Sequence, residues 1–296
     1  MFDATSLLYF YTETPLHAGS GTSVAWVDLP IQREAHTEYP MVQASGIKGA
    51  LRDWASRRDP SNVVAVFGPE TDQADKHAGC LAVTDARILL FPVRAFAEAF
   101  AWVTCPNVLA RFRRDAGLAG VEGLPPVPAV DRFEARIPRG SGLAHNGAVL
   151  LEDMVFSPIE DEALAGWVEV LARALPDEGF GADALARRLA VVSDGEFAGF
   201  VRFSTEVINR IRIDTETGTV AKGALWAEEH LPSETVLYAL AMAGKPRTQS
   251  EALRTGKDVL DWLHTRVLDQ GGVLQLGGDE TVGRGLVWVR SAGGEG

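Results

Sequence analysis

The order of strand-like and helical segments constrains this chain more than any other feature of its sequence. The chain opens on SLLYFYTETPLHAG, an aromatic-rich run with the composition of a strand, which Pro15 and Gly19 close. The residue patterns that follow predict a helix over 44–58, strands over 79–93 and 100–106, a helix over 250–272 and a strand over 285–290. Strand, helix, two strands, helix, strand is the ferredoxin-like order, so we expect an α+β fold with that core.

Both predicted helices carry end signals and one apolar face. Ser45 is placed to cap the first helix, and a glycine pair at 271 and 272 ends the second. Apolar residues recur at helical spacing in both helices, at Ile47, Leu51, Trp54, Leu260, Leu263 and Val267.

Large insertions interrupt the core between its middle strands and its last helix. Residues of about 107–190 are acidic and are predicted to be helical, whereas about 197–226 alternate like a hairpin with a turn at TETGT, 215–219. We therefore expect one domain over 1–296. Its core covers about 1–106 and 232–290.

The composition indicates a cytoplasmic protein without a membrane span. Two cysteines are too few for a disulfide framework and favour a reducing compartment. No apolar run approaches the roughly 18 residues of a membrane helix. The first residues lack the basic start of a signal peptide.

The net charge of −12 argues against nucleic acid as a partner, but the charge is unevenly spread. Residues 150–184 hold nine acidic residues and one basic residue, whereas residues 45–58 hold four basic residues and one acidic residue. Local basic patches on an acidic chain leave nucleic-acid binding open.

The stretch SGIKGALR has the features of a phosphate site at a helix start. Gly46 and Gly49 leave the first turn uncluttered, and Lys48 and Arg52 add charge on one face. A solvated helix edge explains the same residues equally well. The other glycine-rich stretch, GGDETVGRG at 277–285, is not a P-loop, because Arg284 replaces the lysine and a strand follows. It predicts a turn that something can approach closely.

Two isolated residues near the N-terminus are either catalytic or ordinary structural and surface residues. His17 ends the first strand, where a histidine is more often structural, although its ordinary pKa suits proton transfer. Asp28 lies in the loop stretch WVDLPIQRE, where a carboxylate is usually just solvated. If Asp28 acts in chemistry, it must be desolvated, hold a divalent cation or act by positioning. No Cys or His cluster has zinc spacing, and no serine-hydrolase elbow is present.

Seven stretches together resemble the backbone subunits of the type III-B CRISPR (Cmr) effector, a family of the RAMP superfamily. In order along the chain they are PLHAGSG, VDLPIQRE, ASGIKGALR, LFPVRAF, FAWVTCP, NRIRIDTETGTVAKGALWAEEHLP and LGGDETVGRG. The resemblance implies an RRM-like RAMP core with a helical insertion and a protruding β-hairpin thumb. It also implies a filament of copies along a guide RNA (crRNA), within a complex of other Cmr subunits. Each copy is expected to cleave the paired target RNA with a divalent metal, Mg²⁺ or Mn²⁺.

Carried onto this sequence, the resemblance assigns the catalytic and metal-binding aspartate to Asp28, with His17 and one of Glu228 or Glu229 nearby. Lys48 matches the guide-binding lysine, and the 277–285 turn matches a loop that lies against the RNA backbone. The residues expected to bind RNA are Ser45, Gly46, Lys48, Arg52, Arg210, Arg212, Gly277, Gly278, Gly283, Arg284 and Gly285.

Three functions are consistent with the sequence. The first is an RNA-guided endoribonuclease that is also the filament backbone. The second is a guide-binding scaffold without its own cleavage, against which Asp28 in VDLPIQRE argues. The third is a domain that binds a phosphorylated small molecule at Ser45–Lys48.

Overall fold

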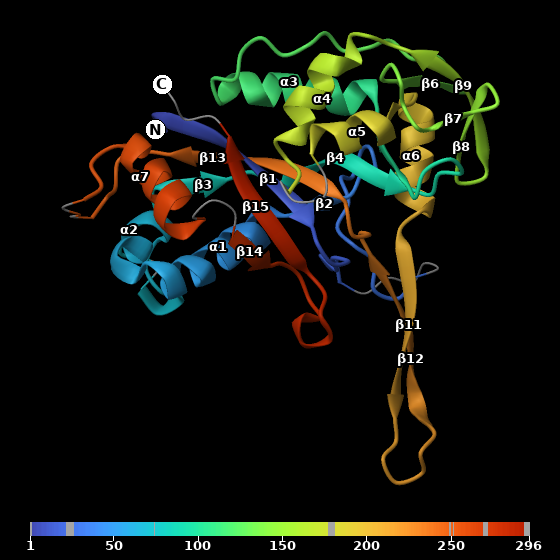
Figure 1. The fold of residues 1–296 in the computed structure, drawn as a ribbon. Coiled ribbons are helices and arrows are strands. Elements are labelled where there is room, and N and C mark those ends of the chain that lie inside the picture. Colours follow the sequence, from blue (N-terminus) through green and yellow to red (C-terminus); the bar gives the residue numbers. More distant parts are fainter. Residues whose placement is uncertain are drawn as a thin grey trace.

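The computed structural model describes residues 2–21, 27–73, 75–176, 181–248, 250, 252–268 and 272–292. Four antiparallel strands form its centre, in the spatial order β15 (Leu286–Ala292), β1 (Ala4–Thr12), β13 (Val236–Ala243) and β4 (Ala86–Val93) (Figure 1). Helix α1 (Ala44–Arg58) follows β1 along the chain, and α7 (Gly256–Trp262) follows β13. The ferredoxin-like order is therefore confirmed.

The third central strand is not the one that the sequence predicted. Strand β5 (Ala101–Thr104) exists, but it pairs with the far edge of β4. The central place belongs to β13, whose run VLYALAMA is buried at seven of its eight positions between β1 and β4. Continuous apolar runs of this kind suit a strand covered on both faces.

Helices cover both faces of these central strands. Phe112 of α3 (Pro106–Leu118) packs against Tyr9 and Tyr238, with ring centroids 6.2 and 5.1 Å away. On the opposite face of β1, Ser6 Oγ lies 3.1 Å from Nε2 of His264, just after α7. Alternate residues of a strand point to opposite faces, so each sheet face has its own helix layer (Figure 1).

The first helix has the predicted bounds but a different N-cap. Ile47 and Leu51 are fully buried, and Trp54 Nε1 donates to the carbonyl of Val267 at 2.8 Å. The cap residue is Gln43, and Ser45 lies inside the first turn, so the predicted Ser45 cap is wrong. The amide of Ala44 is instead satisfied by the Asp85 carboxylate at 2.8 Å, from another segment of the chain.

The last helix is shorter than predicted. It begins at Gly256 behind a capping box of Thr255 and Asp258, and it continues as a π-helical turn over Leu263–Val267. Its predicted apolar residues are buried. Gly271 lies outside the described residues. Gly272 starts strand β14 (Gly272–Gln275), which the sequence analysis missed and which pairs with β15.

The segment of about 107–190 is mixed rather than helical. Besides α3, its described residues form two helices and five strands: α4 (Leu164–Ala172), α5 (Ala182–Arg188), β6 (Glu134–Ile137), β7 (Ala144–His145), β8 (Ala148–Leu151), β9 (Met154–Glu160) and β10 (Leu189–Val191). These strands extend the sheet beyond β5 in the order β10, β6, β9, β8, β7. These strands are short, and β6 and β10 pair with segments far from them along the chain, so local periodicity did not show them.

The hairpin begins later than predicted. Residues Asp194–Phe203 form helix α6, with a capping box of Ser193 and Glu196, and the hairpin consists of β11 (Glu206–Ile213) and β12 (Val220–His230). The predicted turn is confirmed, since Asp214 accepts hydrogen bonds from the amides of Glu216 and Thr217. The outer part of the hairpin projects from the body of the molecule (Figure 1).

The remaining elements are short: β2 (Met41–Val42), η1 (Pro60–Asn62), α2 (Val63–Phe67), η2 (Thr71–Gln73), β3 (Leu81–Val83) and η4 (Glu280–Val282). Among the described residues, no helix has both the length and the apolar character that a membrane span needs. The division into core, insertion and thumb stays a prediction.

Candidate active site at the base of the hairpin

The loop that carries Asp28 is fastened to strand β12 at the base of the hairpin. The Asp28 side chain is exposed, and its Oδ2 accepts a 2.8 Å hydrogen bond from the amide of Ala227. Leu29 donates to the Ala227 carbonyl at 3.0 Å and accepts from the Glu229 amide at 3.0 Å, so the loop runs alongside β12. An exposed carboxylate is thereby held at a fixed place on the hairpin base.

The side chain of Glu229 holds this loop in place. The residue is 2% exposed, and its carboxylate accepts from the amide of Ile31 at 3.1 Å, from Arg33 at 2.6 Å and from Thr205 at 2.8 Å. The hydrogen-bonding capacity of the Glu229 carboxylate is therefore used to hold the loop that follows Asp28.

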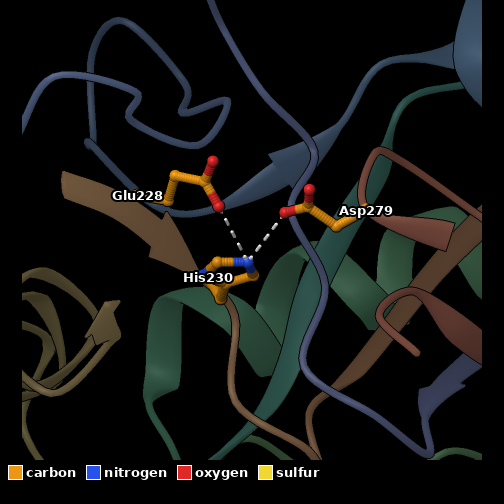
Figure 2. A group of neighbouring side chains, drawn as sticks. All are labelled: Glu228, His230 and Asp279. Carbon is orange, nitrogen blue, oxygen red and sulfur yellow. Dashed lines mark ion pairs between the residues drawn. The ribbon is translucent and has the colours of Figure 1, made fainter. Parts of the chain in front are cut away.

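Glu228 points to the other face of β12, where a compact charged cluster lies (Figure 2). Trp226 Nε1 donates to its carboxylate at 2.6 Å, and Arg210 donates to it at 2.8 Å. The same arginine reaches Asp279 at 2.9 Å. Nε2 of His230 lies 4.0 Å from Glu228 Oε2 and 3.4 Å from Asp279 Oδ2.

Burial sets the electrostatics of this cluster. His230 is fully buried. Burial is the main cause that lowers its pKa, and the neighbouring His17 lowers it further, although Asp279 acts in the opposite direction. For Asp279 burial acts to raise the pKa, but the side chains of Glu228, Arg210 and His230 outweigh it and lower the pKa.

His17 contacts both the charged cluster and the glycine-rich turn. Its Nδ1 is 2.7 Å from the Glu229 carbonyl, and its ring centroid is 5.3 Å from that of His230. A carbonyl only accepts, so Nδ1 carries a proton, and Nε2 presents a lone pair in the neutral form. The carbonyl of His17 accepts from the amide of Gly278 at 3.0 Å.

The predicted turn at 277–285 needs its glycines for this close packing. Gly277 has φ of +69°, and a Cβ added there would collide with the His17 carbonyl. Gly285 has φ of +75°, and an added Cβ would collide with the Leu276 carbonyl. Arg284 lies 4.0 Å from Glu206, at the start of the hairpin.

The residues predicted at the start of α1 are only partly brought together. Ser45 and Lys48 line a pocket of about 380 Å³ with two more cations, Lys245 and Arg247. Lys48 is half-buried, and burial lowers its pKa. Arg52 lies outside this lining and pairs with Glu70 at 2.8 Å.

The two hairpin arginines also separate. Arg210 is engaged at the hairpin base, whereas Arg212 is exposed further along β11. Sequence reasoning missed His230 and Asp279. Asp279 stood inside the quoted glycine-rich stretch, and its positive φ of +64° gives it a glycine-like backbone in the turn.

The sequence predicted one metal ligand, Asp28. Asp28 belongs to no group of three possible ligands in the part of the chain that the structure describes, so its metal role stays a prediction. One such group exists there, formed by Glu228, His230 and Asp279, with ligand atoms within 4.8 Å of one another. Carboxylate and imidazole donors fit a divalent cation.

A family model for the RAMP superfamily matches residues 9–288. This chain therefore belongs to the RAMP superfamily, as its motifs indicated. Within it, the chain is 38% identical over 296 residues to the CRISPR system Cmr endoribonuclease Cmr4 of Pyrococcus furiosus, covering 96% of this chain and 94% of that protein. It is 26% identical to the CRISPR system CMR subunit Cmr4 of Saccharolobus solfataricus, covering 94% and 93% of the two chains.

Solved structures show the same fold. The crystal structure of oligomeric Cmr4 from Pyrococcus furiosus superposes with a TM-score of 0.74 and 31% identity, over 97% of each chain. A chain in the cryo-EM structure of the type III-B Cmr-beta complex bound to cognate target RNA gives a TM-score of 0.72 over 98% of each chain. Its identity of 19% supports the fold alone.

Proposed function

We propose that this chain is the target-cleaving backbone subunit of a type III-B CRISPR effector, an RNA-guided endoribonuclease. The observation that carries the proposal is the exposed Asp28 carboxylate, fixed on the hairpin base by the Ala227 amide. The 38% identity to a protein named as the Cmr endoribonuclease supports the activity.

The chemistry we assign to the site is geometric and electrostatic. A target nucleotide splayed out by the hairpin of a neighbouring copy aligns its 2′-hydroxyl behind its own phosphate, so that attack is in line. Asp28 faces this phosphate with the oxygen that the Ala227 amide leaves available. Nε2 of His17, opposite the protonated Nδ1, has the lone pair that can take the 2′-hydroxyl proton, while the P–O5′ bond to the next nucleotide breaks and water protonates the leaving oxygen. A divalent ion, Mg²⁺ or Mn²⁺, would stabilise negative charge on the phosphate when bound.

Between the two candidate glutamates, the contacts favour Glu228 for a role in the site. Glu229 is already used by Ile31, Arg33 and Thr205 to hold the loop. Glu228 shares its face of β12 with His230.

The guide RNA is assigned to the pocket at the start of α1 and to the glycine-rich turn. Three basic residues line that pocket: Lys48, Lys245 and Arg247. Its described lining contains no acidic residue, although the net charge of the chain is −12. The partners are guide and target RNA, further copies of this chain in a filament and the other Cmr subunits. The cytoplasm is the compartment.

Target cleavage by the reconstituted complex with Mn²⁺ or Mg²⁺ tests this proposal. Asp28→Asn should lower the cleavage rate by about a hundredfold or more while assembly and target binding persist, because an exposed loop carboxylate contributes little to folding. Asp183→Asn, which changes an exposed carboxylate on α5, is the matched control and should cut normally.

Two outcomes would contradict the assignment. Normal cutting by the Asp28→Asn complex would remove the catalytic role from this residue. A wild-type complex that binds the paired target but does not cut it would identify a scaffold.

A further inference from the structure

The charged cluster of Glu228, His230 and Asp279 has the geometry of a cation site (Figure 2). Glu228 and His230 are two residues apart on β12 and so share one face of the strand. Asp279 comes from the glycine-rich turn, far along the chain. The three side chains therefore meet only through the fold.

The imidazole of His230 gives the second, independent sign of a ligand. The residue is 0% exposed, and neither ring nitrogen has a hydrogen bond of normal geometry. Buried polar atoms are nearly always paired in native proteins, so an orphan imidazole needs an explanation. Its Nε2 points at the two carboxylates, 3.4 Å from Asp279 and 4.0 Å from Glu228.

A cation already lies at this place in the free chain. The guanidinium of Arg210 bridges Glu228 at 2.8 Å and Asp279 at 2.9 Å. Arg210 belongs to the projecting hairpin, and its side chain is 23% exposed, so it can turn out into water without unfolding the body. The cluster thus holds two carboxylates, one guanidinium and the unpartnered imidazole of His230.

We propose that Glu228, His230 and Asp279 form a divalent-cation site for which Arg210 is the built-in competitor. Two carboxylates and one imidazole suit Mn²⁺ better than Mg²⁺, which prefers a shell of oxygen ligands. Trp226 orients the Glu228 carboxylate from outside the site at 2.6 Å. An RNA phosphate that draws Arg210 away leaves both carboxylates to the ion.

This inference deepens the proposed function, because it names ligands for the ion that cleavage is proposed to use. The β-bridge between Leu29 and Glu228 places the site beside the loop that carries Asp28. Mn²⁺ binding is measured on the isolated chain without RNA. A result that contradicts the ion site therefore does not contradict the cleavage proposal, and the reverse also holds.

The test is Mn²⁺ binding to the isolated full-length chain, followed by the electron paramagnetic resonance signal of free Mn²⁺. Arg210→Ala should bind Mn²⁺ about tenfold tighter than wild type, because a positive charge near the divalent ion is removed. Arg210→Gln is a second variant with the same expectation. Arg212→Ala, which removes the exposed arginine two residues along β11, should leave Mn²⁺ affinity unchanged.

The ligands are tested in the Arg210→Ala background. Adding Asp279→Asn should lower Mn²⁺ affinity about tenfold or more, whereas Glu280→Gln, an exposed neighbour in the same turn, should not. Adding His230→Gln should reduce the preference for Mn²⁺ over Mg²⁺ in competition. Circular dichroism confirms that each variant is folded. Equal Mn²⁺ affinity of wild type and both Arg210 variants, or no loss with Asp279→Asn, overturns the proposal.

Discussion

Four consecutive residues of β12, Ala227 to His230, contact two segments that are far apart in the sequence. The Ala227 amide holds Asp28, and the Glu229 carboxylate holds the loop that follows. Glu228 and His230 turn to the opposite face and meet Asp279. Because strand side chains alternate between faces, one short stretch holds both the loop that carries Asp28 and the charged cluster. A one-residue shift of β12 would exchange these roles.

Glu234 lies outside the candidate site and has a carboxyl group whose pKa is shifted by burial. Burial raises the pKa of its carboxyl from the ordinary 4.5 to about 7, and its Oε2 has no hydrogen-bond partner. Between these two values the folded chain holds a proton that the unfolded chain has released, so this group makes stability fall as pH rises from about 4.5 to 7. Below that window the effect is absent, and above it the loss is complete.

Glu234→Gln should remove this pH-dependent loss. We expect the difference in unfolding free energy between the variant and wild type, measured by urea denaturation, to shift in favour of the variant from pH 5 to pH 8. Glu280→Gln, which changes an exposed carboxylate, is the control and should follow wild type. A Glu234→Gln difference that stays constant over this range would contradict the prediction.

The hairpin is the element on which the proposed geometry depends most. Nothing in the described chain packs on its outer half, and Ile211, Ile213 and Leu225 are exposed there. Its base is fixed to the body by the β-bridge between Leu29 and Glu228 and by the ion pair of Arg210 with Asp279. The tip can therefore change without loss of the base contacts.

Deleting the tip, about 214–222, should leave a folded chain that binds RNA. Cleavage at regular intervals should nevertheless fall about a hundredfold, because the displaced nucleotide and its in-line geometry are lost even with Asp28 present. Thermal unfolding, RNA binding and target cleavage of the reconstituted complex check the three statements. Glu216→Gln, which keeps the tip length, is the control. A tip-deleted complex that cuts at the same evenly spaced sites would show that the hairpin does not set the geometry.

At the scale of the whole molecule, an acidic chain is proposed to bind an acidic polymer. With a net charge of −12, long-range attraction cannot provide the binding, so local cations must do so. The pocket lined by Lys48, Lys245 and Arg247 concentrates three of them on one side of α1. Salt therefore distinguishes a specific patch from a general charge effect.

Lys48→Ala should weaken guide-RNA binding about three- to tenfold at low salt and reduce the salt slope of the affinity by about one, as expected for one lost phosphate contact. The two proteins should converge as salt rises. Fluorescence anisotropy over a salt series measures this. Lys76→Ala, which removes an exposed lysine that donates to Gln73, is the control. Equal affinities of Lys48→Ala and wild type at low salt would rule out the contact.

The sequence by itself determined the features that depend on neighbouring residues. The bounds of α1, its buried face of Ile47 and Leu51, the Asp214–Thr219 turn and the glycine-rich turn follow from spacing and backbone preference within a short window. The resemblance carried by seven motifs identified the superfamily, which the family model confirmed. It also singled out Asp28, which residue patterns alone would have left as a solvated loop acid.

Only the tertiary structure decided which distant segments meet. It placed β13 rather than 100–106 at the centre of the sheet, and it turned part of the predicted hairpin into α6. It gave Glu229 to the loop and Glu228 to the cluster, and it brought Asp279 to His230 from the turn. The physical reason is that strand pairing and charge pairing between remote segments leave no periodic trace in the local sequence, whereas helix faces and turns do.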